Sequence, residues 1–434
     1  MQDVEKQTHI FLQAKLSDLV KKVCPGMSRP VYKFVRDMTF GICGTGTSSV
    51  HNIAKNIHDD ISTKKTSERL YRNLGREDLD TKLQESLMNI ACPKIKEDTL
   101  IIVDESDIEK PYAKKMEGCK KVHNGSKATQ TNGYNLLNFV TCTEIEQGYN
   151  LLPVCSSLIS TDLEPDSTKQ LMQDRMIEIA IKANGRGIFV FDRGYDDRKT
   201  IGFMVENGMR FIIRGVGKRN IQEHCIERKF NDVIKEMEFA YELPAFKNDE
   251  FFLCSTKRIR VRTDGNPSRR ANGVEISLIV ARKYKRSNRS RQIGKDFYLL
   301  CDFADKNLSE IEIVERSIMA YRKRWKIEEL FRQMKQDYRW EKIRVSSYTK
   351  LKNLNMLMTL ALYFVYSCKD SIERIAAAFP KIICFRKNDW KKLHNFVYYR
   401  ICQALKKCFD RTYHYNTSPY RRDKIEPLQL RLRF

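Results

Sequence analysis

The sequence has little of what marks disordered, membrane-spanning or secreted chains. Only 19 Gly and 11 Pro occur among 434 residues, and 41% of the residues are hydrophobic, which excludes long disordered segments. The longest nearly uncharged apolar run, between Lys352 and Lys369, falls short of the roughly 20 residues that span a bilayer, so we predict a buried helix there. The N-terminus lacks the continuous apolar core of a signal peptide, and we expect neither export nor membrane binding.

The 13 Cys residues also lack an organising pattern. Their number is odd, no C-x-x-C pair occurs, and no His lies nearby at zinc-finger spacing. We therefore expect reduced, mostly buried thiols and a cytoplasmic, nucleoid-associated protein. A structural zinc site and a catalytic Cys are the less favoured alternatives.

Acidic residues are scarce relative to basic ones. Lys and Arg total 79 against 55 Asp and Glu, and the net charge of +24 indicates a polyanionic partner, with nucleic acid as the first candidate. Between Ser255 and Leu300 there are thirteen Lys or Arg and three acids. A charge run usually marks a solvated face, but this clustering favours a phosphate-binding surface.

Residues 1–95 show apolar side chains at helical spacing and no strand pattern. Within them, a helix capped by Thr47 or Ser48 and a second helix after a polar turn predict a helix-turn-helix that reads DNA. An ordinary helical pair with a solvated basic face fits the pattern equally well. The candidate DNA-reading side chains are Lys64, Lys65, Arg69 and Arg72.

From Thr99 onward, short apolar runs predict the strands of a mixed α/β layer. The predicted elements are a strand TLIIVD, a hairpin in NLLNFVTCTEIEQGYNLLPVCSS, a helix over 167–183 capped by Asp166 or Ser167, a strand GIFVFD, a short helix over 199–206 capped by Asp196 or Asp197, and a strand RFIIRG.

Beyond residue 215 the pattern changes again. Residues 216–303 alternate as basic, exposed strands, with GNPSRRANG as a mobile hairpin tip. A long helix is predicted from Asn307 or Ser309 to Gln336, and the remaining chain is mainly helical.

Two predicted strands end in an acid, Asp104 in IIVDESD and Asp192 in FVFDRGYDD. Acids at strand ends project into the crevice where α/β sheets bind ligands, although they can equally start a turn or cap a helix. The long helix supplies a third acid, Glu328. At about 100° per residue it shares one stripe beside the apolar face with Tyr321, Arg324 and Lys335.

The same helical geometry predicts that Glu328 lies at the edge of the core, while Lys326, Glu329 and Gln333 face water. An amphipathic helix with ordinary charge pairs four residues apart is the alternative. Three carboxylates from two strands and a helix can hold two divalent cations about 3.5–4 Å apart for in-line attack on a phosphodiester. Mg²⁺ suits such hard oxygen ligands, and Mn²⁺ can substitute.

These residues resemble a known family, the DDE transposases of bacterial insertion sequences in the insertion-sequence-four group. Asp104 stands in VDESDIEKPYAKKMEG, and Asp192 stands in FDRGYDD ahead of RFIIRG. The string YRKRWKIEELFRQMK fits the group's Y-x2-R-x3-E-x6-K signature at Tyr321, Arg324, Glu328 and Lys335. The similarity runs from about Thr99 to Arg344.

The resemblance implies an α/β, RNase H-like catalytic core that is interrupted by a β-rich insertion, with helical N-terminal and C-terminal regions. The expected domains are a helical DNA-binding domain (1–95), the first part of the core (96–215), a basic β-rich insertion (216–303), the second part of the core with the signature helix (304–370) and a helical basic C-terminal region (371–434).

The resemblance also implies roles for single residues. Asp104, Asp192 and Glu328 are the expected catalytic metal ligands for two Mg²⁺ ions. Tyr321, Arg324 and Lys335 are expected to hold DNA phosphates, and Arg324 is suited to bidentate contact. The other candidate DNA contacts are Arg193, Arg214, Lys64 and Lys65.

The implied function is cut-and-paste transposition by a homodimer on double-stranded DNA, through nicking, hairpin formation, hairpin opening and strand transfer. Relatives with hairpin chemistry stack a flipped base on a Trp of the insertion, but the three Trp here are Trp325, Trp340 and Trp390. Trp325 is expected to pack, and the candidate stacking rings are Phe251, Phe252, Tyr284 and Tyr298. The alternatives are a domesticated, non-catalytic DNA-binding protein and an RNase H-like nuclease of another kind.

Overall fold

The computed structural model confirms the helical character of the N-terminal part. It describes residues 2–57, 61–124, 129–145, 148–164, 168–223, 226–245, 247, 249–263, 273–303, 307–383 and 397–412. The N-terminal helices are α1 (Gln2–Val23), α2 (Arg29–Thr45), α3 (Val50–Asn56), α4 (Thr63–Leu74) and α5 (Leu79–Ala91), followed by the short turn η1 (Cys92–Lys94). The N-cap of α3 is Ser49, one or two residues later than predicted. Gly46 ends α2 with a φ of 63°, a left-handed conformation that suits glycine.

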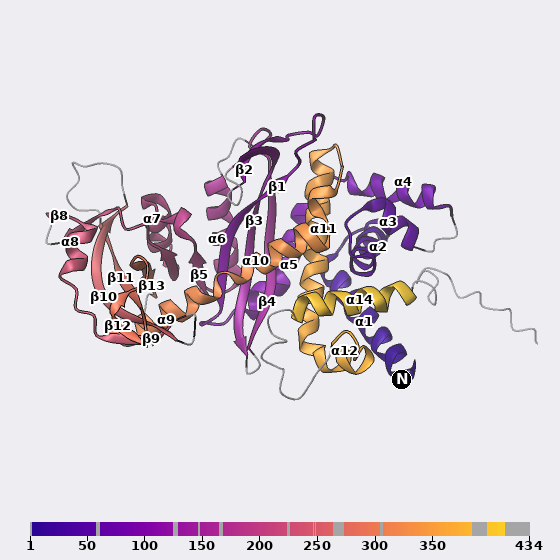
Figure 1. Cartoon of the computed structure of the whole chain (residues 1–434). Helices are drawn as coiled ribbons and strands as arrows, with labels where there is room; N and C mark the ends of the chain where they lie inside the picture. Colours follow the sequence, from indigo (N-terminus) through magenta and orange to yellow (C-terminus); the bar gives the residue numbers. More distant parts are fainter. Residues whose placement is uncertain are drawn as a thin grey trace, which may run out of the picture.

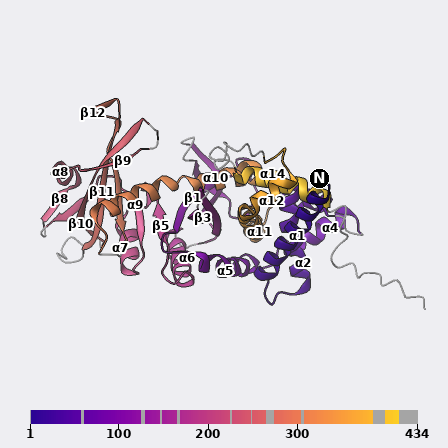
Figure 2. The same cartoon turned by 90° about the horizontal axis from the view of Figure 1, so that it is seen from below.

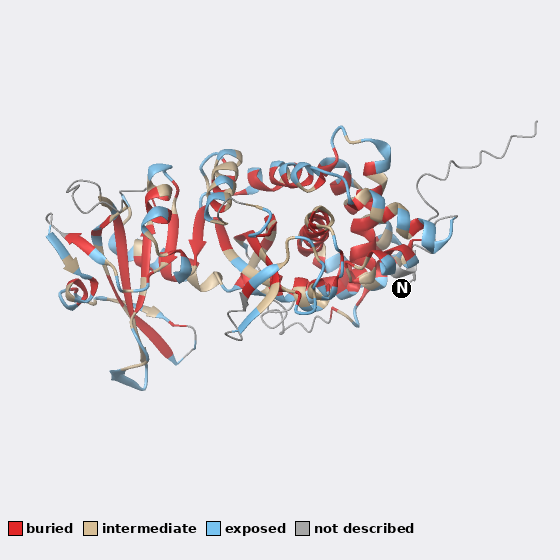
Figure 3. Cartoon of the chain, turned by 90° about the horizontal axis from the view of Figure 1, so that it is seen from above, coloured by how far each residue is buried: buried red, intermediate tan, exposed pale blue. Residues whose placement is uncertain are grey.

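These helices pack around α11 (Tyr348–Ser367), whose side chains are almost all buried, as predicted for the uncharged run. The C-terminal helices complete the bundle, with η5 (Cys368–Ser371), α12 (Ile372–Ala378) and α14 (Val397–Thr412). Figure 3 shows the burial concentrated on α11 and on the strands. No helix in the described part of the chain is long and apolar enough to cross a membrane.

A single mixed sheet of 13 strands forms the rest of the described fold. Its order is β2-β3-β1-β5-β6-β13-β11-β10-β7-β8, with β4 on β3, β9 on β10 and β12 on β11. Only β1–β5 and β5–β6 are parallel pairs among those described. The bounds are β1 Leu100–Glu109, β2 Lys120–Asn124, β3 Thr129–Ile145, β4 Gly148–Ile159, β5 Ile188–Phe191, β6 Phe211–Arg214, β7 Asn220–Glu223, β8 Ile226–Lys229, β9 Tyr241–Pro244, β10 Glu250–Arg262, β11 Gly273–Lys285, β12 Asn288–Gln292 and β13 Phe297–Asp302.

Short helices connect these strands: α6 (Thr168–Lys182), η2 (Arg193–Tyr195), α7 (Arg198–Glu206) and α8 (Phe230–Lys235). Asp197 caps α7, as predicted, by accepting a hydrogen bond from the Thr200 N–H at 3.1 Å. Asp196 instead forms an ion pair with Arg219. The predicted caps of α6, residues 166 and 167, lie outside the described residues.

The first predicted strand is longer than expected. Its parallel pairing with β5 ends at Ile102 and Val190, but its antiparallel pairing with β3 continues to Glu109. Asp104 therefore lies within β1 rather than at its end. The acid still stands where the parallel neighbour stops, and the strand continues because β3 supplies hydrogen bonds beyond that point.

The β-rich segment joins the same sheet, because β13 pairs with both β6 and β11. The prediction of exposed strands was wrong for β11, since residues 276–281 are buried. This strand lies between β10 and β13, so it is interior to the sheet rather than at an edge. The predicted hairpin tip falls mostly within residues 264–272, which lie outside the described residues.

The predicted long helix is interrupted. A capping box at Ser309 starts α9 (Glu310–Lys323), which confirms one of the two predicted starts. A turn at Arg324 and Trp325 separates α9 from α10 (Lys326–Arg332). A π-helical turn, η3 (Gln333–Asp337), and the 3₁₀ turn η4 (Trp340–Lys342) follow. Figures 1 and 2 show α9 and α10 running from the β-rich end of the molecule past β1 toward α11.

Candidate active site

Asp104 and Asp192 stand at the same level of two adjacent parallel strands. The register pairs Ile102 with Val190, and each acid lies two residues beyond that pair on its own strand. Asp192 directly follows β5 and caps η2, where its Oδ1 accepts a hydrogen bond from the Gly194 N–H at 2.7 Å. Both acids thus lie just beyond the point where the parallel pairing of β1 with β5 ends.

Arg324 joins Asp104 to Glu328. Its Nη1 lies 3.0 Å from Oδ2 of Asp104, and its Nη2 lies 3.1 Å from Oε1 of Glu328. The charge of Asp192 also acts on both Arg324 and Asp104. Arg324, in the turn between α9 and α10, therefore pairs directly with two of the three acids that the sequence singled out, and the charge of the third, Asp192, acts on the same guanidinium.

The helical wheel was wrong about which acid faces water. The Glu328 side chain is 61% exposed, whereas the Glu329 side chain is 14% exposed and forms an ion pair with Lys326 at 2.9 Å. Lys326 and Gln333 are buried as well. The wheel placed the apolar face correctly, since Ile327, Leu330, Phe331 and Met334 are all buried, but the buried side of this segment is wider than that apolar stripe. Lys326 is also accommodated by the Tyr149 ring, whose centroid lies 4.3 Å from its Nζ.

Burial and like charges make Asp104 a weak acid for an aspartate. Burial is the main cause that raises the pKa of Asp104 to about 7, and the charges of Asp192 and Glu328 raise it further. Arg324 and the N–H of Glu105 act in the opposite direction. A carboxyl group in this state favours a second cation beside it, because a cation would compensate the buried negative charge.

Lys335 contacts a different set of acids. Its Nζ lies 3.8 Å from Asp107 Oδ1 and 3.7 Å from Glu341 Oε1. With Glu109, these two acids form a cluster in which one carboxylate oxygen of each lies within 4.8 Å of the others. Among the described residues, no other group of three His, Cys, Asp or Glu is that close together. The predicted set of Asp104, Asp192 and Glu328 is thus more widely spaced than this.

Tyr321 and Arg214 meet beside the three acids. The Arg214 guanidinium lies 4.2 Å from the centroid of the Phe297 ring, and the Tyr321 ring packs edge-on against the same ring at 5.3 Å. Together with Arg324 and Trp325 they line a hollow of about 340 Å³. Its other lining residues are Phe252, Ala281, Lys283, Ile293, Gly294, Lys295 and Arg322.

Trp325 was expected to pack, and that expectation was wrong, because 46% of the residue is exposed. It follows Arg324 in the turn between the two helices, and the Lys326 Nζ lies 3.9 Å from the centroid of its ring. Two of the rings suggested for base stacking are unsuitable, since Phe251 and Phe252 are each 3% exposed. Trp340 is fully buried, and Trp390 lies outside the described residues.

The remaining candidate DNA contacts are distributed over the surface. Lys64 and Lys65 are exposed in the first turn of α4, and Arg193 is exposed directly after Asp192. Arg69 is different, because its Nη2 lies 3.0 Å from Oδ2 of the buried Asp37. That ion pair ties α4 to α2, so Arg69 has a structural partner rather than a side chain held out for reading DNA.

Cysteine chemistry has no part in this site. The eleven described Cys are all free, and ten of them are buried, as the sequence predicted. Burial raises the pKa of the Cys301 thiol to about 12, which keeps it protonated and unreactive. Only Cys119 is partly accessible among the described cysteines.

Two residues near the acids gave no signal in the sequence. Asn138 lies on β3 directly opposite Asp104, and neither polar atom of its buried side chain has a partner. Lys110 follows β1, and its buried Nζ donates hydrogen bonds to three backbone carbonyls at 340, 341 and 343. The position of Asn138 beside Asp104 follows from the pairing of β3 with β1. The role of Lys110 follows from the packing of residues 340–343 against it.

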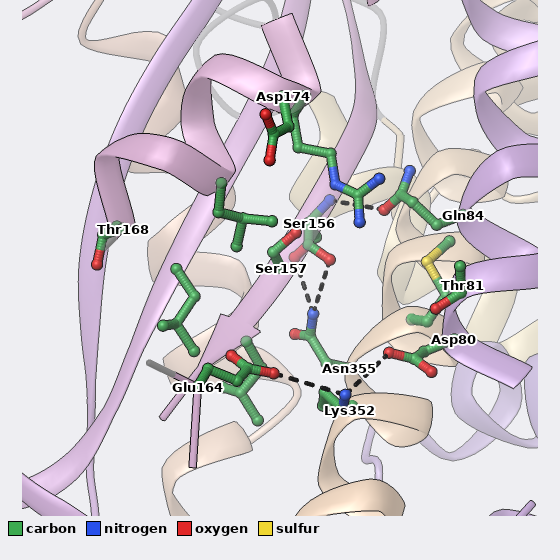
Figure 4. A pocket seen from close by; sticks show the side chains of 15 residues that line it. Asp80, Thr81, Gln84, Ser156, Ser157, Glu164, Thr168, Asp174, Lys352 and Asn355 are labelled. Atoms are coloured by element: carbon green, nitrogen blue, oxygen red, sulfur yellow. Dashed lines mark hydrogen bonds and ion pairs between the residues drawn. The ribbon is translucent and has the colours of Figure 1, made fainter. Parts of the chain in front are cut away.

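A separate hollow of about 250 Å³ lies between α5, β4, α6 and α11 (Figure 4). Asn355 and Gln84 bind the Ser156 region there, and Lys352 lies 3.9 Å from Asp80 and 3.5 Å from Glu164. None of the predicted metal ligands lines it. Its polar groups mainly join the helical bundle to the sheet.

Comparison with known proteins gives one match. The family model described as the transposase DDE domain matches residues 95–364, which is more than half of the chain and includes all three acids. No curated protein matches the chain.

Proposed function

The chain belongs to the family of transposase DDE domains, and from this premise we propose that it is a cut-and-paste DNA transposase of the insertion-sequence-four group. The proposed reaction is metal-dependent hydrolysis of phosphodiesters at the ends of the element, followed by joining of the 3′-hydroxyl ends to target DNA. The observation that carries the proposal is the pairing of Arg324 with both Asp104 and Glu328, together with Asp192 directly after β5, the strand parallel to β1.

The donor set fits a divalent metal. The three side chains offer only carboxylate oxygens, which Mg²⁺ prefers and Mn²⁺ accepts. We propose that Asp104, Asp192 and Glu328 hold two such ions, which supply Lewis acidity and an activated oxygen nucleophile when bound. The ion pairs to Arg324 show that a cationic group is already stabilised between Asp104 and Glu328. We propose that Arg324 then leaves these carboxylates and forms its ion pair with a DNA phosphate instead.

The hollow beside the acids supports a role in holding a DNA end. Arg214, Tyr321, Arg324 and Trp325 line it, so it combines cations for a phosphate with rings for a base. We propose that it receives an unpaired nucleotide during a hairpin step. Trp325 takes the stacking role that relatives assign to a Trp of the insertion. Lys335 is proposed to bind phosphate nearby, after release from Asp107 and Glu341.

The partners follow from the proposed reaction. We propose that the enzyme binds the terminal inverted repeats through Lys64 and Lys65 of α4 and through Arg193 at the site. A homodimer brings two DNA ends together, and the reaction takes place on nucleoid DNA in the bacterial cytoplasm.

The test uses the purified full chain and a labelled duplex that carries an inverted repeat flanking its gene. With Mg²⁺, the wild type should nick the duplex, form hairpins and join ends to a second duplex. Asp104→Ala, Asp192→Ala and Glu328→Ala should each lower cleavage by at least about 10³-fold, because a lost ligand removes the metal-dependent path. Their affinity for the duplex, measured by fluorescence anisotropy, should stay within a factor of about three.

Three results discriminate between readings. Asp107→Ala and Glu341→Ala are the matched acid controls, and loss of cleavage in them with normal cleavage in Asp104→Ala would move the metal to the second cluster. Binding without cleavage by the wild type in either metal would support a domesticated DNA-binding protein.

Trp325→Ala should still nick but accumulate fewer hairpin ends on a denaturing gel.

A further inference from the structure

Asn138 is a buried amide with no hydrogen-bond partner beside the proposed metal ligand Asp104. The residue is 1% exposed, and both its Oδ1 and its Nδ2 are buried and unpartnered. Buried side-chain polar atoms are usually satisfied, because an unmade hydrogen bond in the interior costs folding free energy. An apolar side chain of the same size would serve the fold better at this position.

The register of the sheet decides what the amide can reach. Asn138 on β3 pairs directly with Asp104 on β1, so both side chains point to the same face of the sheet as nearest cross-strand neighbours. On its other side Asn138 pairs with Ser156 of β4, whose hydroxyl already accepts a hydrogen bond from Asn355 at 3.0 Å. Asp104 is the stronger acceptor of the two neighbours, because a carboxylate is charged and its two oxygens offer about four lone pairs.

The contacts that Asp104 makes explain why the Asn138 amide does not donate a hydrogen bond to it. Its Oδ1 accepts a hydrogen bond from the Glu105 N–H at 3.0 Å, and its Oδ2 is held by Arg324 at 3.0 Å. If Arg324 moves to a DNA phosphate, the carboxylate loses the group that fixes its orientation. An amide directly opposite on the neighbouring strand, on the same face of the sheet, is placed to take over that task.

We propose that Asn138 is a positioning residue whose side-chain amide donates a hydrogen bond to the Asp104 carboxylate when that carboxylate binds a divalent cation and Arg324 moves off it. The proposal rests on the proposed function, since it requires Asp104 to be a metal ligand. Carboxylates that bind metals are commonly held by such hydrogen bonds, whose loss weakens metal binding about 10–100-fold.

The test compares metal affinity with stability in Asn138→Leu, which keeps the number and branching of the side-chain heavy atoms and removes the amide. Titration with Mn²⁺ in the absence of DNA, followed by electron paramagnetic resonance of the free ion, should give a dissociation constant at least about 10-fold above that of the wild type. The Tm of the metal-free variant should be equal or higher, because an unsatisfied polar group has been removed. Asn138→Ser keeps a donor and should recover part of the affinity.

Asn353 provides the matched control. It is fully buried, its amide donates hydrogen bonds to the carbonyls of Leu74 and Arg76 at 2.8 and 2.7 Å, and its Oδ1 accepts one from the Asp80 N–H at 2.8 Å. Asn353→Leu should therefore lower the Tm and leave Mn²⁺ affinity unchanged. Opposite effects of the two Leu variants would separate a positioning role from a structural one.

The outcomes separate this inference from the function on which it rests. If Asp104→Asn binds Mn²⁺ as tightly as the wild type, both the proposed metal site and the role of Asn138 are wrong. If Asp104→Asn loses affinity while Asn138→Leu keeps it, only the role of Asn138 is wrong. If Asn138→Leu does not fold, Asn138→Ala carries the same test, because it also lacks the donor.

Discussion

At the scale of single residues, the candidate site is defined by charges that compensate one another. Asp104, Asp192 and Glu328 would repel each other if they stood alone, and Arg324 pairs directly with two of them. Arg324 thus offsets the repulsion between Asp104 and Glu328. Because burial raises the pKa of Asp104 to about 7, its protonation changes within a pH range in which stability can be measured.

The raised pKa of Asp104 predicts a pH-dependent stability of the metal-free protein. In the folded protein burial raises this pKa from 3.8 to about 7, so between these values the folded state binds the proton more strongly than the unfolded chain. The contribution of Asp104 to stability is therefore largest at low pH and falls as pH rises to about 7. Asp104→Asn should raise the Tm of the metal-free protein more at pH 8 than at pH 5.5.

Calorimetry with a chelator present measures this difference. Glu341→Gln is a suitable control, because it removes an acid of the neighbouring cluster and should not reproduce the pattern. Equal changes in Tm at both pH values for Asp104→Asn would show that this carboxyl has an ordinary pKa.

At the scale of elements, the signature segment is held at both ends against β1. Arg324 contacts Asp104 at one end, and the Lys110 ammonium binds the backbone after α10 at the other. Lys110 is 5% exposed, and its three acceptors lie at 2.8, 3.0 and 2.8 Å. The two contacts fix Glu328 relative to the sheet although the helix itself is interrupted.

We predict that Lys110→Met destabilises the fold. Three backbone carbonyls would lose their donor, and the free energy of unfolding should fall by roughly 3 kcal/mol or more. Urea unfolding followed by circular dichroism measures the change. Lys114→Met is the matched control, because Lys114 is exposed in the loop that follows and should change stability by less than about 0.5 kcal/mol. If the two variants had the same urea midpoint of unfolding, the Lys110 hydrogen bonds would not stabilise the fold as proposed.

At the scale of the whole molecule, the excess positive charge should govern binding to DNA. Six proposed phosphate contacts come from separate parts of the chain: Lys64, Lys65, Arg193, Arg214, Arg324 and Lys335. Neutralising about six phosphates predicts a slope near −5 for the logarithm of affinity against the logarithm of salt concentration. Fluorescence anisotropy with the inverted-repeat duplex between about 50 and 200 mM salt measures it.

The double variant Lys64→Gln, Lys65→Gln should make that slope less steep by about 2. The corresponding change at Lys21 and Lys22 on α1 is the control and should leave the slope unaltered. A wild-type slope near zero would exclude phosphate contacts as the main source of affinity.

The sequence by itself determined the kinds of elements and singled out the candidate acids. Apolar runs and acid-ended strands predicted β1 and β5, and the spacing of Tyr321, Arg324, Glu328 and Lys335 singled out the signature segment. The strand predictions succeed because strand patterns are local, whereas the roles of the four signature residues stay a prediction. The buried α11 was equally readable, since one long uncharged run can only be an interior or membrane element.

Only the tertiary structure decided which side chains meet. Packing against neighbouring segments covers more of α10 than its apolar stripe, so Lys326 and most of Glu329 are buried while Glu328 and Trp325 stay exposed. Asn138 is a neighbour of Asp104 through strand register, and Lys110 reaches carbonyls more than 200 residues away. Such pairings depend on how distant segments pack, and no local pattern of residues encodes them.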